Sequence, residues 1–441
     1  SAGPPGRRSV AREVPREVAL RVSLDPEGFR GFAVEARALR RLDPDMDPNT
    51  RVLLGTTGPA DARDTARLLG EGLTRQEILA VSVGRSGVER AFDGALRGEF
   101  GRESAYRDLH GSVLSRETRD PVVDGEDLRL TVSDALNGAA RGILGGSRGA
   151  LVAMDPRTGA ILAAAGNDGP EGGGVFPPAA GYLPGSVFKV LTAAVALEGD
   201  LAPGAGEVEC RGARSRPLPC SHDHGRPGMR EAISGSCNAY FGETALRIGV
   251  RPLEDWARLL RIDRPPGLRL PGEGGGTDWT QALYRNEWER TDLANLGIGQ
   301  GPVNLSPLQV AALYAAVANG GRPVTPHLVA GRGPAPGEPV FSPATLWTVR
   351  AGLEDTVLRG TGSGKGLEEF RFAGKTGTAQ VKKGPPGERR LHAWFAGYAP
   401  AEDPRIVVVA VLLDQQESGG DAAGPLVAEF LRAWRRAGEG R

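Results

Sequence analysis

The sequence around residue 186 reads Leu183-Pro-Gly-Ser-Val-Phe-Lys189 and continues as Val190-Leu-Thr-Ala-Ala-Val-Ala-Leu197. The run after Pro184-Gly185 is apolar on nearly every side, so it predicts a buried helix over residues 186–197. Ser186 and Lys189 stand three positions apart, one turn along the same helix face. A desolvated lysine amine there can take the proton of a serine hydroxyl and make it a nucleophile. The stretch predicts a catalytic serine at a helix start, although S-x-x-K alone is a common pattern.

Two later strings carry compatible chemistry. Ser236-Cys-Asn238 lies within residues 229–248, whose periodicity predicts a helix, and offers a hydroxyl and an amide. Lys375-Thr-Gly-Thr378 lies on a strand predicted over residues 370–380. Its glycine would let an extended substrate lie close to the strand, and Lys375 and Thr378 would offer donors to a carboxylate. Taken singly, the first string could be a helix cap and the second a strand entering a turn.

Lysine usage points to the same positions. The chain has five lysines, and arginine serves almost everywhere else. Arginine cannot be deprotonated in a protein, whereas a buried lysine can lose its proton and act as a base. Lys189 and Lys375 therefore mark places where arginine would fail. Lys382 and Lys383 stand beside a Gly-Pro-Pro loop and are expected to be solvated charges.

The order of predicted elements indicates an α/β protein of the α+β type. A hairpin (residues 150–153 and 161–165) follows a short strand (128–132) and a helix ending near 143. Helical patterns cover 252–260, 306–318 and 342–358, strand patterns cover 370–380, 394–398 and 406–413, and a helix closes the chain over 423–436. We expect a mixed sheet flanked by helices. Residues 1–120 show helical periodicity at 29–42, 60–73 and 88–96 but no catalytic group. They predict a smaller non-catalytic domain ahead of a catalytic domain over 121–441.

Composition excludes other classes of protein. Lys plus Arg equals Asp plus Glu at 54 each, so no net charge attracts nucleic acid or anionic lipid. No apolar run of about eighteen residues occurs, so the sequence shows no transmembrane helix and no signal-peptide core. Cys210 and Cys220 could pair in an oxidising compartment or remain free thiols. His222-Asp-His224 with Cys220 fits no standard zinc spacing, so a structural loop is expected and no metal site is predicted.

The three strings, in this order and context, resemble the motif set of β-lactamases and penicillin-binding proteins. Further stretches are similar to class B penicillin-binding proteins, the monofunctional members of the family. These are residues 128–132, 153–159, 183–186, 220–225, 236–241, 297–301, 305–309 and 392–395. The resemblance covers residues 127–436, and before them only Ser86–Gly98 resembles the pedestal domain of that family.

The resemblance implies a β-lactamase/transpeptidase-like fold and a serine-type D-Ala-D-Ala transpeptidase that cross-links peptidoglycan stem peptides and is acylated by β-lactam antibiotics. In such an enzyme Ser186 would attack the penultimate D-Ala and release the terminal one, with Lys189 as its base. Ser236 and Lys375 would pass the proton to the leaving amine. A second stem peptide's amine would then take the acyl group. No cofactor is implied.

The remaining motif residues would hold the substrate. Asn238 would bond the peptide backbone, and Thr376 and Thr378 would bind the terminal carboxylate beside Gly377. The N–H groups of Ser186 and Thr378 would form an oxyanion hole. The resemblance further implies an extracytoplasmic location, a membrane anchor outside the given sequence, and a polytopic SEDS-type glycosyltransferase as partner, with no nucleic acid.

Alternatives of other classes remain at this point. A β-lactamase or β-lactam sensor shares these motifs, but the class A kind needs a water-activating glutamate, and no E-x-x-L-N string stands between Asn238 and Lys375. A bifunctional synthase would need a glycosyltransferase domain, for which the N-terminal part is too short. A non-catalytic cell-wall scaffold would not need every reacting residue. The sequence does not distinguish elongation, division and sporulation roles.

Overall fold

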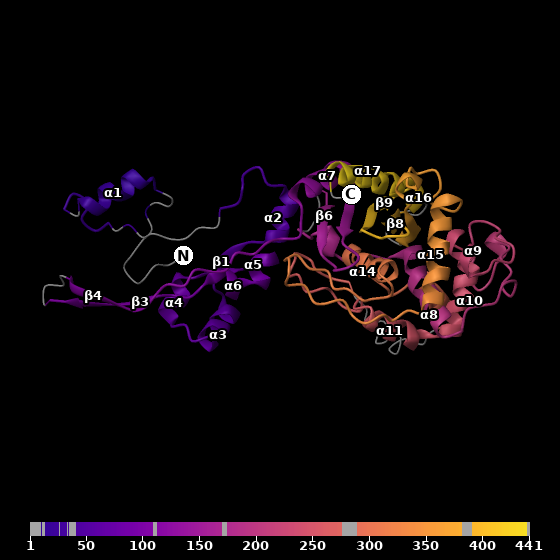
Figure 1. Cartoon of the computed structure of the whole chain (residues 1–441), viewed down its shortest axis with the longest axis horizontal. Helices are drawn as coiled ribbons and strands as arrows, with labels where there is room; N and C mark the ends of the chain where they lie inside the picture. Colours follow the sequence, from indigo (N-terminus) through magenta and orange to yellow (C-terminus); the bar gives the residue numbers. More distant parts are fainter. Residues whose placement is uncertain are drawn as a thin grey trace. The chain divides into compact units, whose positions relative to one another are not determined.

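In the computed structural model the chain forms two compact units (Figure 1). The structure describes residues 10, 14–25, 27–32, 34, 41–108, 113–169, 174–275, 289–381 and 390–438. The first unit comprises residues 1–46, 56–85 and 92–126, and the second comprises 47–55, 86–91 and 127–441. Lys382, Lys383 and much of the helix predicted over 29–42 lie outside the described residues. No helix of the described part is both long and apolar enough to cross a membrane.

The first unit is built on two short hairpin-like pairings. Strand β1 (Thr57–Pro59) pairs antiparallel with β2 (Ser82–Gly84), and the chain between them forms α3 (Ala62–Gly70) and α4 (Arg75–Ala80). Each helix begins with a capping box, which satisfies the free N–H groups of its first turn. A small core of Leu68, Ile78, Val81 and Val83 lies beneath them. The unit also contains α1 (Arg16–Leu24), α6 (Asp93–Arg97) and the hairpin of β3 (Arg102–Arg107) and β4 (Val113–Asp120).

The second unit is organised around one five-stranded sheet in the order β6-β5-β9-β8-β7. Its strands are β5 (Gly149–Met154), β6 (Ile161–Asn167), β7 (Ala373–Val381), β8 (Arg390–Ala399) and β9 (Ile406–Gln415). The fold class expected from the sequence is confirmed, but the sheet is antiparallel at every ladder instead of mixed as expected. The last strand, β9, lies between β5 and β8. The sheet therefore combines β5 and β6 with three strands that come much later in the chain. Strand β7 lies at one edge.

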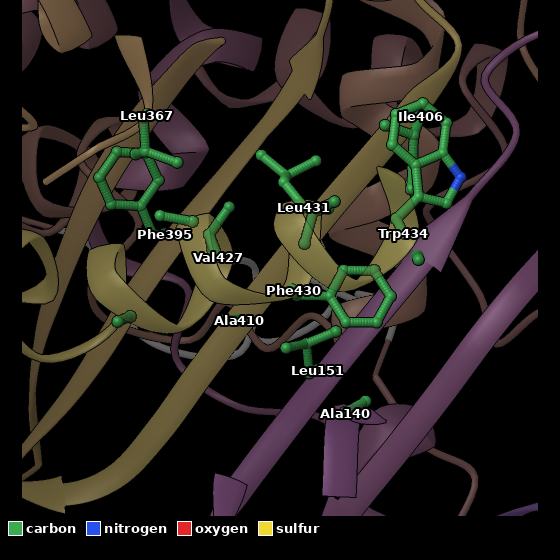
Figure 2. Packing of buried hydrophobic residues seen from close by; sticks show 14 of the residues in the cluster. Ala140, Leu151, Leu367, Phe395, Ile406, Ala410, Val427, Phe430, Leu431 and Trp434 are labelled. Carbon is green, nitrogen blue, oxygen red and sulfur yellow. The ribbon is translucent and has the colours of Figure 1, made fainter. Parts of the chain in front are cut away.

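Helices cover both faces of this sheet. On one face α7 (Asp134–Leu144) and α17 (Gly424–Arg436) pack on alternate residues of β5, β8 and β9. Figure 2 shows Phe430, Leu431 and Trp434 of α17 over this face, with Leu151 of β5 beneath Phe430. Each such side chain contributes about 1.5–3 kcal/mol when it is removed from water. On the other face lies α14 (Pro307–Ala318), all of whose residues are buried, as its uniformly apolar sequence requires.

The second unit contains further helices, of which α8 and α10 carry residues of the motifs. They are α2 (Pro48–Leu54), α5 (Gly87–Ala91), α8 (Lys189–Glu198), α9 (Met229–Ser234), α10 (Asn238–Ile248), α11 (Val250–Leu259), α13 (Arg290–Gly297), α15 (Pro343–Leu358) and α16 (Gly419–Ala422), with 3-10 turns at Pro177–Ala179, Gly185–Phe188, Gly212–Arg214 and Glu368–Phe370.

Three predicted elements are wrong in detail. The helix predicted over 229–248 is broken at residues 235–237, where Gly235 ends α9 and Ser236 takes a positive φ of 58°. The helix predicted over 88–96 is interrupted at Phe92, whose backbone is not helical. The strand predicted over 128–132 is a single bridge between Leu130 and Val329. In each case local periodicity continued across a point where the tertiary structure turns the chain.

Candidate active site

Ser186 lies in the short 3-10 turn η2 (Gly185–Phe188) that leads into α8, rather than in the α-helix itself. The turn depends on Gly185, which has a φ of 56° and donates its N–H to the Gly299 carbonyl oxygen at 2.9 Å. A Cβ at residue 185 would lie 3.0 Å from backbone atoms of Thr378 and Ala379. Backbone atoms of the first motif (Ser186–Lys189) therefore pack directly against those of the third motif (Lys375–Thr378). Ser186 is half-buried beside them.

The side chain of Lys189 connects the first motif to the second motif (Ser236–Asn238). Its side chain is 1 % exposed, and its ammonium donates to the Ser236 carbonyl oxygen at 2.7 Å, to Ser236 Oγ at 3.1 Å and to Asn238 Oδ1 at 2.7 Å. Burial lowers the pKa of Lys189 to about 8, because the charged form loses its hydration. The hydrogen bonds of the described residues include none between Lys189 and the Ser186 hydroxyl. The base role of Lys189 stays a prediction.

The second motif is a bend followed by a helix start. Ser236 lies in the bend and Asn238 is the first residue of α10. The Asn238 side chain is fixed at both ends, because Oδ1 accepts from Lys189 and Nδ2 donates to the Pro219 carbonyl oxygen at 3.0 Å. The positive φ of Ser236 costs about 1–3 kcal/mol in strain, which the surrounding contacts must offset. A strained, well-anchored serine is typical of a functional position.

The third motif occupies the edge strand β7. Lys375 is fully buried, and its Nζ donates to the Thr376 carbonyl oxygen at 3.0 Å. Burial, together with repulsion from the charge of Lys189, lowers the pKa of Lys375 well below its usual value. Thr376 Oγ1 lies 2.6 Å from Thr361 Oγ1, and Thr378 Oγ1 accepts from the N–H of Gly419 at 3.1 Å.

Gly377 permits the strand to approach the first motif. A Cβ there would lie 2.9 Å from Val187 Cγ1, 3.0 Å from Trp394 Cβ and 3.1 Å from the Pro184 carbonyl oxygen. The sequence predicts that this glycine lets the substrate approach the strand, and these close contacts show that packing requires it too. The outer side of β7 has no neighbouring strand in the described sheet. An extended peptide could pair with such an edge.

The three motifs thus meet at one place, and their charge is unusual. Neither Lys189 nor Lys375 forms an ion pair with a carboxylate among the described residues, and the charge of Lys189 lowers the pKa of Lys375. Two buried amines without a carboxylate partner lose protons more readily than solvated lysines do, because burial removes the hydration of the charged form. The arrangement can therefore accept a proton from a nearby hydroxyl and pass it on. Ser186 and Ser236, both half-buried, are the hydroxyls placed beside it.

A second group of reactive side chains lies directly behind the second motif. We call Cys210, Cys220, His224 and Cys237 the Cys/His cluster; one ligand atom from each lies within 4.8 Å of the others. The three thiols are free, so the alternative of a disulfide between Cys210 and Cys220 is not the state of this structure. His222, which stands two positions before His224 in the same sequence string, is exposed and outside the cluster. Sequence reasoning missed the cluster because its members are 10, 4 and 13 positions apart, which matches no standard zinc spacing.

Two protein-family models match this sequence and establish the family to which the chain belongs. The penicillin binding protein transpeptidase domain matches residues 149–432, well over half of the chain. This chain belongs to the penicillin-binding protein family. The penicillin-binding protein dimerisation domain matches residues 6–130, which agrees with a separate N-terminal part. The family and the fold class expected from the motifs are confirmed.

This penicillin-binding protein is similar to named relatives in two bacteria. Peptidoglycan D,D-transpeptidase MrdA of Acinetobacter baumannii is 31 % identical over 77 % of this chain and 59 % of the relative. Stage V sporulation protein D of Bacillus subtilis is 31 % identical over 96 % of this chain and 70 % of the relative. The chain therefore spans about three-fifths of the length of the first relative. A chain solved in a peptidoglycan synthase complex superimposes with a TM-score of 0.72 at 25 % identity, covering 96 % of this chain and 80 % of the other.

Proposed function

We propose that this penicillin-binding protein is a serine-type peptidoglycan D,D-transpeptidase that joins stem peptides through an acyl-enzyme on Ser186. The observation that carries the proposal is the hydrogen-bond set of Lys189. A buried amine one turn from Ser186, with no carboxylate partner among the described residues, donates to both polar side chains of the second motif. A merely structural lysine would be expected to pair with a carboxylate or reach solvent.

The reaction follows from the positions of these groups. Lys189, in its neutral form, takes the proton of Ser186 as Oγ attacks the carbonyl carbon of the penultimate D-Ala. The N–H groups of Ser186 and Thr378 stabilise the oxyanion. Ser236 and Lys375 deliver a proton to the amine of the departing D-Ala. An acceptor amine then attacks the ester, and Ser186 recovers its proton.

Substrate binding is assigned to the edge of β7 and to α10. A stem peptide lies antiparallel along β7 opposite Asn238, whose amide bonds its backbone. Thr376 and Thr378 bind the terminal carboxylate, supported by the buried positive charge behind them. Gly377 keeps the strand free of a side chain at the point of closest approach.

The wider setting is proposed from the family. Residues 1–120 serve as a non-catalytic pedestal and 121–441 as the transpeptidase domain. The chain works on the outer face of the cell membrane, anchored by a segment outside the given sequence, beside a SEDS-type glycosyltransferase that supplies glycan strands. The likeness to a chain solved in a peptidoglycan synthase complex supports a polymerase partner.

A penicillin chase experiment tests the proposal against its nearest rival, a β-lactamase of the same fold. Rapid deacylation requires a base that holds a water against the ester, and a transpeptidase benefits from excluding that water. We expect fluorescent penicillin to remain attached for many minutes after free drug is removed, with Ser186→Ala unlabelled. Loss of the label within seconds, with turnover of the drug, would make the protein a β-lactamase. No labelling at all would favour a scaffold.

A further inference from the structure

The turn that follows α13 lies against the first motif. Helix α13 ends at Gly297, and none of the proposed catalytic steps uses residues 297–301. Within this turn Gly299 is buried and takes a φ of 73°. Its carbonyl oxygen accepts the N–H of Gly185 at 2.9 Å. The turn therefore contacts the chain directly before the nucleophile, Ser186.

The end of a helix explains the conformation of Gly299 but not the need for a glycine. Its N–H and that of the next residue donate to carbonyl oxygens three and five positions back, both at 2.9 Å. This pair of bonds is a Schellman motif, in which a left-handed residue ends the helix. The same pair ends α8 at Asp200 and α11 at Arg261, whose φ angles are 52° and 59°. The motif alone thus accepts a side chain in this protein.

The missing side chain of Gly299 leaves room for one backbone carbonyl. A Cβ there would lie 2.1 Å from the carbonyl oxygen of Gly185 and 2.8 Å from its carbonyl carbon. Overlaps with backbone atoms cannot be relieved by rotating a side chain, so the peptide itself would have to move. This carbonyl belongs to the trans peptide group that carries the N–H of Ser186. In a planar trans peptide the C=O and N–H point to opposite sides, so the Ser186 N–H points away from Gly299.

The same peptide group is packed against the third motif, which supplies the other N–H of the proposed oxyanion hole. A Cβ at Gly185 would lie 3.0 Å from the carbonyl carbon and oxygen of Thr378. The N–H of Ser186 has no hydrogen-bond partner among the described residues, which leaves it available to a substrate oxygen. A shift of the 185–186 peptide would change both the direction of this N–H and its distance from the N–H of Thr378.

The turn is itself anchored on two other helices. The carbonyl oxygen of Gly297 accepts the buried hydroxyl of Thr192, on α8, at 2.8 Å. Gly297 also packs on α10, where an added Cβ would lie 2.4 Å from Ala245 Cβ and 3.0 Å from the Phe241 carbonyl oxygen. Interiors packed this closely transmit a small displacement to their neighbours. Gly299 consequently has little freedom to retreat from the peptide that it supports.

We propose that Gly299 is a positioning residue for the oxyanion hole. It holds the 185–186 peptide so that the N–H groups of Ser186 and Thr378 both reach the oxygen of the tetrahedral intermediate. Gly299 acts through this peptide and touches no reacting atom. This role rests on the proposed function, because it concerns the acylation of Ser186. A side chain at residue 299 should weaken binding of the transition state and leave binding of the ground state intact.

Gly299→Ala and Gly301→Ala form a matched pair of variants. Both residues have a positive φ, of 73° and 86°, but nothing lies within 4 Å of a Cβ at residue 301. Acylation by fluorescent penicillin, measured up to saturating drug, separates the limiting acylation rate from the dissociation constant of the initial complex. Gly299→Ala should lower the limiting rate by at least ~10²-fold, as the loss of one oxyanion donor does. Its dissociation constant should stay within about 3-fold of the wild-type value, and Gly301→Ala should match the wild type in both.

Equal limiting rates in the two variants would overturn the proposal. A rise in the dissociation constant that accounts for the whole loss of acylation would overturn it as well. If Gly299→Ala does not fold, Thr192→Val tests the turn from its other end, because it removes the hydroxyl that holds Gly297. The limiting rate should then fall by about 2- to 10-fold, the worth of one hydrogen bond, and Thr192→Ser should restore it. A wild-type rate in Thr192→Val, or no rescue by serine, would refute the positioning role.

Failure of the proposed function gives a different result. An unlabelled wild type would refute the transpeptidase assignment, and the positioning role with it. A wild type that is labelled on Ser186, together with a Gly299→Ala variant that is labelled equally fast, would refute the positioning role alone.

Discussion

Replacing Lys189 by arginine separates the charge of this residue from its ability to lose a proton. At pH 7 a lysine with a pKa of about 8 is neutral in about one molecule in ten. With the ordinary pKa of 10.5 the neutral fraction is about 3 in 10,000. Burial therefore raises the supply of free base by about 300-fold. An arginine, with a pKa above about 12, would be neutral in fewer than about one molecule in 10⁵.

Lys189→Arg should consequently slow penicillin acylation by at least ~10²-fold, the lower end of what a general base contributes. The measurement is the acylation rate with fluorescent penicillin as a function of pH. In the wild type the rate should rise as Lys189 loses its proton, reach half of its maximum near pH 8 and then level off. The rise has this sign because the neutral amine is the reactive form. Lys365→Arg, at an exposed ion pair with Asp421, is the matched control and should behave as the wild type.

A Lys189→Arg variant that is folded and is acylated at near wild-type rate would refute the base assignment. A wild-type rate that falls with pH between 7 and 9 would refute it independently, because it would require the protonated amine.

Three further variants test how the site is supported. Gly377→Ala should lower stability by about 1–3 kcal/mol in thermal unfolding, because the added Cβ lies 2.9 Å from a valine of η2; an unchanged melting temperature would contradict the close packing. Phe430→Ala should cost about 3–5 kcal/mol in denaturant unfolding, whereas Leu259→Ala, at a side chain 51 % exposed, should stay within about 0.5 kcal/mol; similar losses would show that α17 does not anchor the core. Thr361→Val removes the hydroxyl 2.6 Å from Thr376 and should slow acylation by about 2- to 10-fold, the worth of one hydrogen bond; an unchanged rate would mean that Thr376 needs no such support.

Elements that depend on local pattern were predictable from the sequence. The hairpin of β5 and β6 follows from two apolar runs around a turn, and α14 and α17 follow from helical periodicity. The motif residues could also be predicted, since the spacing of Ser186 and Lys189 depends only on local geometry. Their grouping follows from the order of motifs in a family rather than from any single string.

Other features depend on contacts between distant residues. The pairing of β5 with β9 joins segments more than 250 positions apart, so the antiparallel order of the sheet is not visible in either segment. The break at residues 235–237 is held by Lys189, 47 positions before Ser236, and by His224, 11 positions before Gly235. The Cys/His cluster is gathered by the same fold. Spacing rules derived from local zinc motifs do not describe it.

The identity of the acylated residue tests the central claim most directly. Trypsin should release residues 158–189, which contain Ser186 as their only serine. After incubation with penicillin, mass spectrometry should find the penicilloyl adduct on that peptide and fragmentation should place it on Ser186. An adduct on any other residue, in a chain whose Ser186 is intact, would contradict the account.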